Sequence, residues 1–249
     1  VLSHTGHEAE KALAAAIPGI DVIVGGHSHT QLTEPVFIGD TLVAQAYEYG
    51  KAVGVLKLEV APAGAAPVSK IKLIEGYLVD AAALSEQNLN DPKVAAIVDG
   101  WEQQVSSQVD IEIAQSSRLI PPVQLRGWME QVIREYTDAD LAYYNRGGVR
   151  DAIRPGAVTV RTLWNIEPFG NSVVTLKVTG AQVRSILASN GDDAGIELED
   201  DRTYLFATNN FVGAHVRRTF GDSIDLQDAG VLVRDILIEA IKTSGLPGQ

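Results

Sequence analysis

The pattern of apolar and polar positions divides the first third of the chain into short strands joined by glycine-rich turns. An apolar run over 20–24 predicts a buried strand, and segments near 52–60 and 68–79 predict two longer strands. Residues 1–3 resemble the end of another strand, and the Ala- and Glu-rich residues 7–16 predict a helix. This region therefore combines several strands with an early helix.

A long helix is expected next, because Asp91 is a favourable N-cap residue and Pro92 is tolerated in a first turn. Apolar residues then recur at helical spacing, at Val94, Ile97, Val98, Trp101 and Val105. The helix separates two regions of different pattern. The sequence thus predicts a first domain over 1–88, a linking helix over 91–109 and a second domain over 110–249.

The second region alternates helices with strands, which is typical of an α/β domain. Helices are predicted over about 122–136, 179–189 and 228–243, and strands over 140–144, 172–178 and 203–208. Thr179-Gly180-Ala181-Gln182 has the form of a capping box at the start of the second helix. The last strand ends at Asn209-Asn210-Phe211, which we expect to form a strand-end loop.

Histidines give the first region its candidate chemistry, since four of the chain's five lie within its first 29 residues. His27 and His29 follow the strand over 20–24, and on an extended chain their side chains would point to the same side. His4 also follows a strand end. Because imidazoles are good ligands for zinc and similar metals, a metal cluster is the leading hypothesis, with ordinary loop histidines as the alternative.

Composition limits the classes of function. The chain has 20 Lys and Arg against 32 Asp and Glu, a formal net charge of -12, which argues against a surface that binds nucleic acid. It has no cysteine, so histidines and carboxylates are left as metal ligands. No stretch of the sequence reaches the roughly 18 consecutive apolar residues of a membrane span.

Candidate binding residues in the second region follow its strands. Asn145 and Arg150 flank Gly147-Gly148, where the backbone can approach a ligand closely, and the guanidinium of Arg150 suits phosphate. Phe169 and Phe211, each near an asparagine, are placed to stack on a flat ring such as a nucleobase. The alternatives are a surface ion pair for Arg150 and core packing for the two phenylalanines.

Several segments together resemble the bacterial 5'-nucleotidase family. They are Leu2-Ser3-His4-Thr5-Gly6, Gly25-Gly26-His27-Ser28-His29-Thr30, Asn145-Arg146-Gly147-Gly148-Val149-Arg150, Pro168-Phe169-Gly170-Asn171 and Val231-Leu232-Val233-Arg234-Asp235-Ile236-Leu237, in the family's order. The resemblance implies an α/β fold: part of a metallophosphoesterase β-sandwich with flanking helices, a linking helix, and a 5'-nucleotidase C-terminal domain. It implies hydrolysis of nucleotides or related phosphate esters, as by 5'-nucleotidases, UDP-sugar hydrolases and 2',3'-cyclic phosphodiesterases, and a periplasmic or extracellular location.

Carried over residue by residue, the resemblance implies metal ligation by His4, His27 and His29, phosphate contacts from Asn145 and Arg150, and base stacking by Phe169 and Phe211. The intact enzyme would hold two divalent metal ions, zinc, manganese or similar. The family's other metal ligands come from an Asp-x-His pair, a second Asp and an Asn-His-Asp/Glu motif that lie earlier in its sequences. We therefore expect this chain to be an N-terminally truncated fragment with little or no activity alone.

The chain departs from the family's pattern at two places. Arg217 stands where the family commonly has an aspartate that holds the ribose, and the region before the helix over 122–136 lacks the pattern that carries a further substrate arginine. Arg118 and Arg126 are candidates for that arginine. The alternatives to a nucleotide hydrolase are a sulfur-ester hydrolase on the same scaffold and a non-catalytic fragment that binds a nucleotide.

Overall fold

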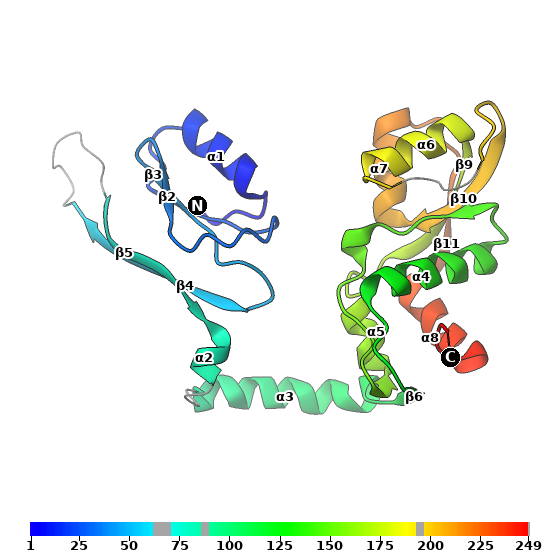
Figure 1. Cartoon of the computed structure of the whole chain (residues 1–249), viewed down its shortest axis with the longest axis horizontal. Helices are drawn as coiled ribbons and strands as arrows, with labels where there is room; N and C mark the ends of the chain where they lie inside the picture. Colours follow the sequence, from blue (N-terminus) through cyan, green and yellow to red (C-terminus); the bar gives the residue numbers. More distant parts are fainter. Residues whose placement is uncertain (62–70, 86–89, 193–196, 249) are drawn as a thin grey trace. The chain divides into compact units, whose positions relative to one another are not determined.

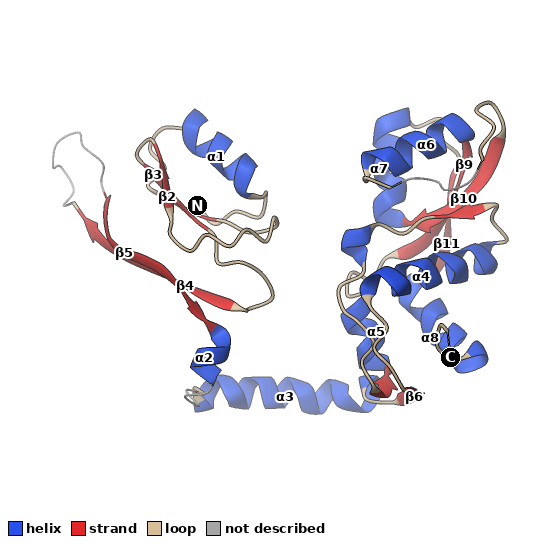
Figure 2. Ribbon diagram, viewed as in Figure 1, coloured by secondary structure: helices blue, strands red, loops and turns tan. Residues whose placement is uncertain are grey.

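The structure, a computed structural model, describes residues 1–61, 71–85, 90–192 and 197–248. The chain forms two compact units, Val1–Ile97 and Val98–Gln249 (Figure 1). Helices and strands occur throughout both units, so the expected mixed α/β class is confirmed (Figure 2). The domain boundaries inferred from the sequence, with a separate linking helix, stay predictions.

A three-stranded sheet is the centre of the first unit. Strand β3 (Thr41–Ala44) lies between β1 (Val22–Val24), which is parallel to it, and β2 (Val36–Ile38), which is antiparallel. Helix α1 (His7–Ala16) packs on this sheet (Figure 1). A small core of buried Ala14, Ile23 and Val43 joins the helix to the sheet.

A two-stranded antiparallel ribbon follows this sheet in the chain. It consists of β4 (Ala52–Val60) and β5 (Ile71–Asp80) and leads into the short helix α2 (Ala81–Ser85). Both strands lie where the sequence predicts them, although the expected start of the second strand, residues 68–70, lies outside the described residues.

The long helix α3 (Pro92–Val109) begins at the predicted residue. An oxygen of the Asp91 carboxylate accepts hydrogen bonds from the backbone amides of Lys93 (2.8 Å) and Val94 (3.3 Å), so Asp91 satisfies amides that a helix leaves unpaired at its start. Among the described residues, no helix is both long enough and apolar enough to cross a bilayer.

A four-stranded sheet in the order β11-β9-β10-β7 is the centre of the second unit (Figure 1). Its strands are β7 (Leu141–Ala142), β9 (Ser172–Thr179), β10 (Thr203–Asn209) and β11 (Leu226–Leu232). Strand β9 is antiparallel to both of its neighbours, and β7 is parallel to β10. A separate antiparallel pair consists of β6 (Glu112–Ser116) and β8 (Gly156–Thr159).

Helices supply a hydrophobic core on each face of this sheet. The first core takes residues from α4 (Pro122–Thr137), α5 (Val160–Ile166) and α8 (Val233–Ser244), and the second from α6 (Gly180–Ser189) and α7 (Asn210–Phe220). Because successive strand residues point to opposite faces, Val173 belongs to the first core and Val174 to the second. Both faces of the sheet are therefore packed against helices, and the loops at the ends of its strands extend from a packed sheet.

The sequence-based prediction is wrong about the start of the last helix. Residues 228–232 are expected to be helical, but they belong to β11, and α8 begins at Val233. Pairing with β9 provides the hydrogen bonds that stabilise the extended conformation, and Gly230 has a φ of 69°, which a helix does not accommodate. Tertiary pairing here outweighs the helical spacing of the apolar residues.

The expected strand-end loop at Asn209-Asn210-Phe211 is also wrong, because α7 begins at Asn210. Asn209 is the N-cap residue, and its side-chain oxygen accepts a hydrogen bond of 2.9 Å from the backbone amide of Val212. Phe211 consequently lies in the first turn of a helix. The strand predicted over 140–144 is shorter than expected and covers Leu141–Ala142.

Candidate functional site

Backbone pairing places His4 beside the turn that follows β1. Leu2 forms a parallel bridge with Val24, and the backbone amide of Ser3 donates to the carbonyl of Val24 over 2.9 Å. The first residues thus extend the sheet alongside β1. Because the carboxyl ends of parallel strands meet at one edge, His4 and the Gly25-Gly26 turn lie at the same edge.

His4 and His27 are in contact. Their ring centroids are 5.1 Å apart and the rings meet edge to face at 68°. Gly26 leaves room for His4, since a Cβ atom there would lie 3.0 Å from Nδ1 of His4, a tight contact. Both histidines are exposed, so their nitrogen atoms are accessible to a small ligand.

His29 is held by a different set of neighbours. Its Nδ1 lies 2.7 Å from Oε2 of Glu48, and its ring meets that of Tyr49 edge to face at 5.3 Å. A hydrogen bond from Lys51, whose Nζ is 2.6 Å from Oε1, lowers the pKa of the Glu48 carboxyl from its usual value. An ionised Glu48 favours the proton on Nδ1 of His29 and leaves Nε2 with a free lone pair.

The backbone at these histidines is not extended, which corrects the geometry assumed from the sequence. His27 has a φ of 70° and His29 a φ of 54°, both in the left-handed region. Non-glycine residues adopt this region at a cost of about 1–3 kcal/mol, and such residues cluster at functional sites. The expectation that the two side chains share one side of an extended strand is therefore wrong.

The structure brings His4 and His27 together and supports His29 with a carboxylate. Among the described residues, however, no three or more His, Asp or Glu side chains form a group that could hold a metal ion. The convergence of all three histidines on a metal stays a prediction. Glu48 is 19 positions from His29 and belongs to no motif, so no pattern in the sequence indicates its contact with His29.

In the second unit, Asn145 lies beside the start of α7. Its Oδ1 accepts a hydrogen bond of 2.9 Å from Nδ2 of Asn209, the N-cap residue of the helix that carries Phe211. Asn145 itself begins the short 3-10 helix η1 (Arg146–Gly148). Gly148 is required in this turn, because a Cβ atom there would lie 2.5 Å from Cε1 of Tyr144.

Arg150 and Phe169 form the second pair. The guanidinium carbon of Arg150 lies 5.7 Å from the centroid of the Phe169 ring, and Nη1 donates to the carbonyl of Gly147 over 3.3 Å. Phe169 is 56% exposed and Phe211 is 61% exposed. Neither phenylalanine therefore belongs to the hydrophobic cores of the second unit, which was the alternative left open by the sequence.

A buried polar network supports the turn that carries Phe169. Glu167 is fully buried, and its Oε1 accepts hydrogen bonds from the hydroxyl of Tyr144 (3.2 Å) and from Nδ2 of Asn171 (2.8 Å). Arg234 of α8 donates to the Glu167 carbonyl over 2.9 Å and has Nη1 3.7 Å from Oε2. Burial and the neighbouring Glu167 raise the pKa of Tyr144, which keeps its hydroxyl a donor.

Asp192 joins three elements around the turn at Asn145. Its carboxylate accepts hydrogen bonds from Nη1 of Arg126 (3.0 Å), Nε of Arg146 (3.1 Å) and the hydroxyl of Tyr143 (3.1 Å), and its side chain is 7% exposed. Burial alone would raise the pKa of Asp192, but the hydrogen bonds from Arg146, Arg126 and Tyr143 outweigh it and lower the pKa. Sequence reasoning missed Asp192, which follows a helix and belongs to no motif.

The two candidates for a further substrate arginine have internal partners. Arg126 binds Asp192, as above, and its Nε lies 3.6 Å from Glu130. Arg118 donates to the side chain of Gln124 over 3.1 Å and to the carbonyl of Pro247 over 3.0 Å, which fastens the end of the chain. In this structure both arginines contribute to folding contacts, and their roles as substrate contacts stay predictions.

We expect Asp192→Asn to destabilise the second unit by about 2 kcal/mol at pH 7, because hydrogen bonds to a charged group contribute about 1.5–3 kcal/mol. The pKa of Asp192 is lowered by folding, so its contribution is present above the unfolded pKa of about 3.9 and is lost as pH falls through the lower folded value. Urea titrations between about pH 7 and pH 2.5 should show the two proteins converging in acid.

The matched control is Asp222→Asn, which removes the same charge from a side chain that is 95% exposed. It should change the free energy of unfolding by less than about 0.5 kcal/mol. A difference between wild type and Asp192→Asn that is the same at every pH would contradict the assigned role of the Asp192 charge.

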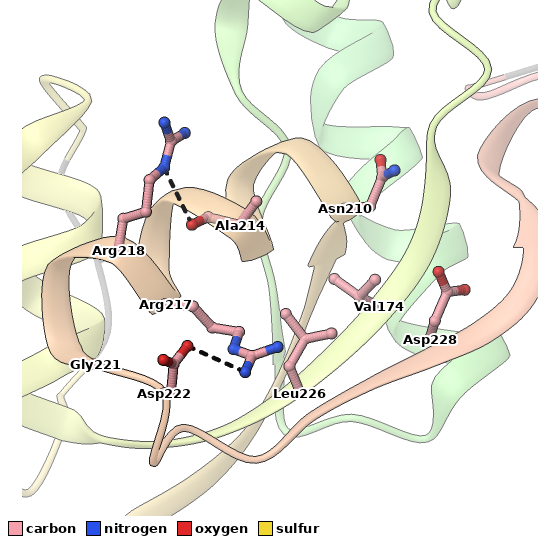
Figure 3. Close-up of a pocket in the computed structure, with 9 residues that line it drawn as sticks. All are labelled: Val174, Asn210, Ala214, Arg217, Arg218, Gly221, Asp222, Leu226 and Asp228. Atoms are coloured by element: carbon pink, nitrogen blue, oxygen red, sulfur yellow. Dashed lines mark hydrogen bonds and ion pairs between the residues drawn. The ribbon is translucent and has the colours of Figure 1, made fainter.

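Arg217 points into a cavity of about 680 Å³ beside α7 (Figure 3). Its Nη2 lies 3.2 Å from Oδ1 of Asp222, and its side chain extends toward Asp222 and Leu226. Asn210 lines the same cavity, two helical turns before Arg217. Arg217 thus stands on the continuous helix α7, at the position where the family resemblance would place a ribose-binding carboxylate.

Comparison with known proteins identifies relatives of both units. Residues 105–195 match the model of the 5'-nucleotidase C-terminal domain. A trifunctional nucleotide phosphoesterase of Bacillus subtilis is 25% identical over 307 aligned positions, which cover 98% of this chain and 20% of that protein. A 5'-nucleotidase of Vibrio cholerae is 25% identical over 244 positions, covering 78% of this chain and 44% of that protein. The chain thus spans less than half the length of these relatives.

Solved structures with a similar fold come from Thermus thermophilus. A 5'-nucleotidase precursor from this organism aligns with a TM-score of 0.72 at 21% identity, over 96% of this chain and 59% of that chain. A sulfate thiohydrolase aligns with a TM-score of 0.70 at 20% identity, over 98% of this chain and 52% of that chain. At these identities the similarity shows a shared fold.

Proposed function

Because the chain belongs to the 5'-nucleotidase family, we propose that it forms part of a phosphoesterase that hydrolyses nucleotides or related phosphate esters. In this proposal the second unit binds the substrate, and the histidines of the first unit contribute to a centre of two divalent cations, zinc, manganese or similar. The proposal includes a periplasmic or extracellular location.

One observation carries the proposed substrate site: two exposed phenylalanines each lie next to a polar anchor in the second unit. Phe211 follows the Asn209 side chain that binds Asn145, and Phe169 lies against Arg150. An exposed aromatic ring offers a flat apolar face, and a nucleobase can stack on such a face.

The anchors suit a phosphate group. Arg150 presents a planar cation that can donate two parallel hydrogen bonds to phosphate oxygens. Since Oδ1 of Asn145 accepts from Asn209, the NH2 group of Asn145 remains available to donate to an anionic oxygen. These residues would bind and orient the ester, and the two rings would hold its base.

The histidines fit a metal centre in their donor chemistry. Glu48 supports His29 at Nδ1 in the way that carboxylates support metal-binding histidines, and Gly26 gives His4 room beside His27. When bound, two divalent cations would activate a water molecule for in-line attack and stabilise the charge on the phosphate. This chain would contribute neutral imidazole nitrogens as ligands from His4, His27 and His29.

The test is phosphate release from AMP in the presence of Mn2+ or Zn2+. We expect little or no turnover by the 249-residue chain, because these histidines alone supply too few ligands for a two-metal centre. A longer protein that also carries the family's Asp-x-His and Asn-His-Asp/Glu motifs should release phosphate in a manner that a chelator abolishes. A longer protein with both motifs that hydrolyses no phosphate ester would overturn the proposed function.

A further inference from the structure

Beneath the Gly25-Gly26 turn lies a buried acid that the proposed site does not use. Glu10, on α1, is fully buried, although glutamate is rarely buried without a partner. Its Oε1 accepts a hydrogen bond of 3.2 Å from the backbone amide of Gly26. Glu10 thus contacts the residue directly before His27.

The absence of a side chain at Gly25 leaves space for this carboxylate. A Cβ atom at Gly25 would lie 2.0 Å from Oε2 of Glu10, so no larger residue fits there while Glu10 keeps its position. Gly26 leaves room for His4, since a Cβ atom at Gly26 would lie 3.0 Å from Nδ1 of His4. Gly25 therefore contacts the Glu10 carboxylate, and the next residue, Gly26, contacts the His4 imidazole.

The second oxygen of Glu10 has no partner. Among the described residues, Oε2 is buried and accepts no hydrogen bond. A buried carboxylate with an unsatisfied oxygen is costly unless a nearby positive charge compensates it. Gly26 contacts both the Glu10 carboxylate and His4, so a divalent cation held by His4 and His27 would place a positive charge near this carboxylate.

We propose that Glu10 is a positioning residue for the His4–His27 pair and that its negative charge strengthens divalent-cation binding there. This inference rests on the proposed metal-dependent function. The hydrogen bond to Gly26 fixes the turn from which His27 projects, while the charge acts through the turn without coordinating the cation. Groups that support metal ligands in this indirect way typically change metal affinity by about 10- to 100-fold.

Two substitutions separate the charge from the packing. Glu10→Gln removes the charge but keeps an oxygen that can accept from Gly26, and Glu10→Met removes both while keeping the length of the side chain. Zn2+ affinity of the chain would be measured at mildly alkaline pH by competition with a chromophoric chelator, and folding by thermal unfolding without metal. We expect both folded variants to bind Zn2+ at least about tenfold more weakly than wild type.

The backbone amide of Gly26 reports on the positioning part of the proposal. Its proton resonance should remain near the wild-type position in Glu10→Gln, where an acceptor is retained, and move upfield in Glu10→Met, where the acceptor is lost. The matched charge control is Glu8→Gln on the same helix, because the side chain of Glu8 is 84% exposed. This control should leave Zn2+ affinity within about twofold, since exposed charges are screened.

The outcomes distinguish this inference from the function on which it rests. If wild type binds Zn2+ and His27→Ala weakens that binding, but folded Glu10→Gln or Glu10→Met binds as wild type does, the role of Glu10 is overturned and the metal site stands. If His27→Ala and wild type bind Zn2+ equally, the histidine site itself is wrong, and the inference fails with it.

Discussion

Replacing Phe211 by alanine is expected to weaken the binding of AMP to the chain by about 5- to 150-fold. Stacking of a base on an aromatic ring contributes about 1–3 kcal/mol to the binding free energy, and about 1.4 kcal/mol corresponds to a factor of ten in affinity. Phe211 is 61% exposed, so the free energy of unfolding should change by no more than about 0.5 kcal/mol. Calorimetric titration with AMP and thermal unfolding of both proteins measure the two quantities.

Tyr136→Ala is the matched control, because Tyr136 is another aromatic residue of the second unit and is 53% exposed. It lies on α4 and has no place in the proposed site. The control should bind AMP as wild type does. Equal AMP affinities for Phe211→Ala and wild type would show that Phe211 does not stack on the base.

Glu167→Ala is expected to destabilise the second unit by about 3–5 kcal/mol, the usual cost of removing one member of a buried ion pair. The substitution leaves the guanidinium of Arg234, whose side chain is 4% exposed, without its carboxylate. It also removes the acceptor for Tyr144 and Asn171. Urea denaturation followed by tryptophan fluorescence would report the loss, because Trp164 stacks on Arg234.

A surface ion pair provides the control for that prediction. Glu102 lies 2.7 Å from Arg161, but its side chain is 51% exposed. Glu102→Ala should therefore cost less than about 1 kcal/mol. Similar losses for the two substitutions would contradict the claim that burial of the Glu167–Arg234 pair sets the size of the effect.

Local patterns in the sequence were sufficient to predict much of the fold. Asp91 caps α3, and the Thr179 and Gln182 side chains form the predicted capping box of α6, because these signals depend on residues a few positions apart. The start of α8 could not be predicted in the same way. Residues 226–228 and Leu232 belong to a strand because they pair with β9, which lies far from them in the sequence.

In the candidate site, too, residues in local motifs could be predicted from the sequence, whereas contacts between distant residues could not. Strand ends and glycine turns predict that His4, His27 and His29 converge. The structure brings the rings of His4 and His27 together, and the convergence of all three stays a prediction. Residues that support the site from a distance gave no pattern: Glu10 is 16 positions from Gly26, and Asp192 is 46 positions from Arg146. Such partners become visible when the fold brings distant segments together, since a single carboxylate in a sequence carries no information about its contacts.

We expect the exposed rings of the second unit to bind the base of a nucleotide. Intermolecular nuclear Overhauser effects between AMP and the chain, with phenylalanine rings selectively labelled, would show this contact. We predict contacts from the adenine H2 and H8 protons to the rings of Phe169 and Phe211, and loss of the latter in Phe211→Ala. Saturable AMP binding with no contact to either ring, or no AMP binding by the folded chain, would contradict the claim.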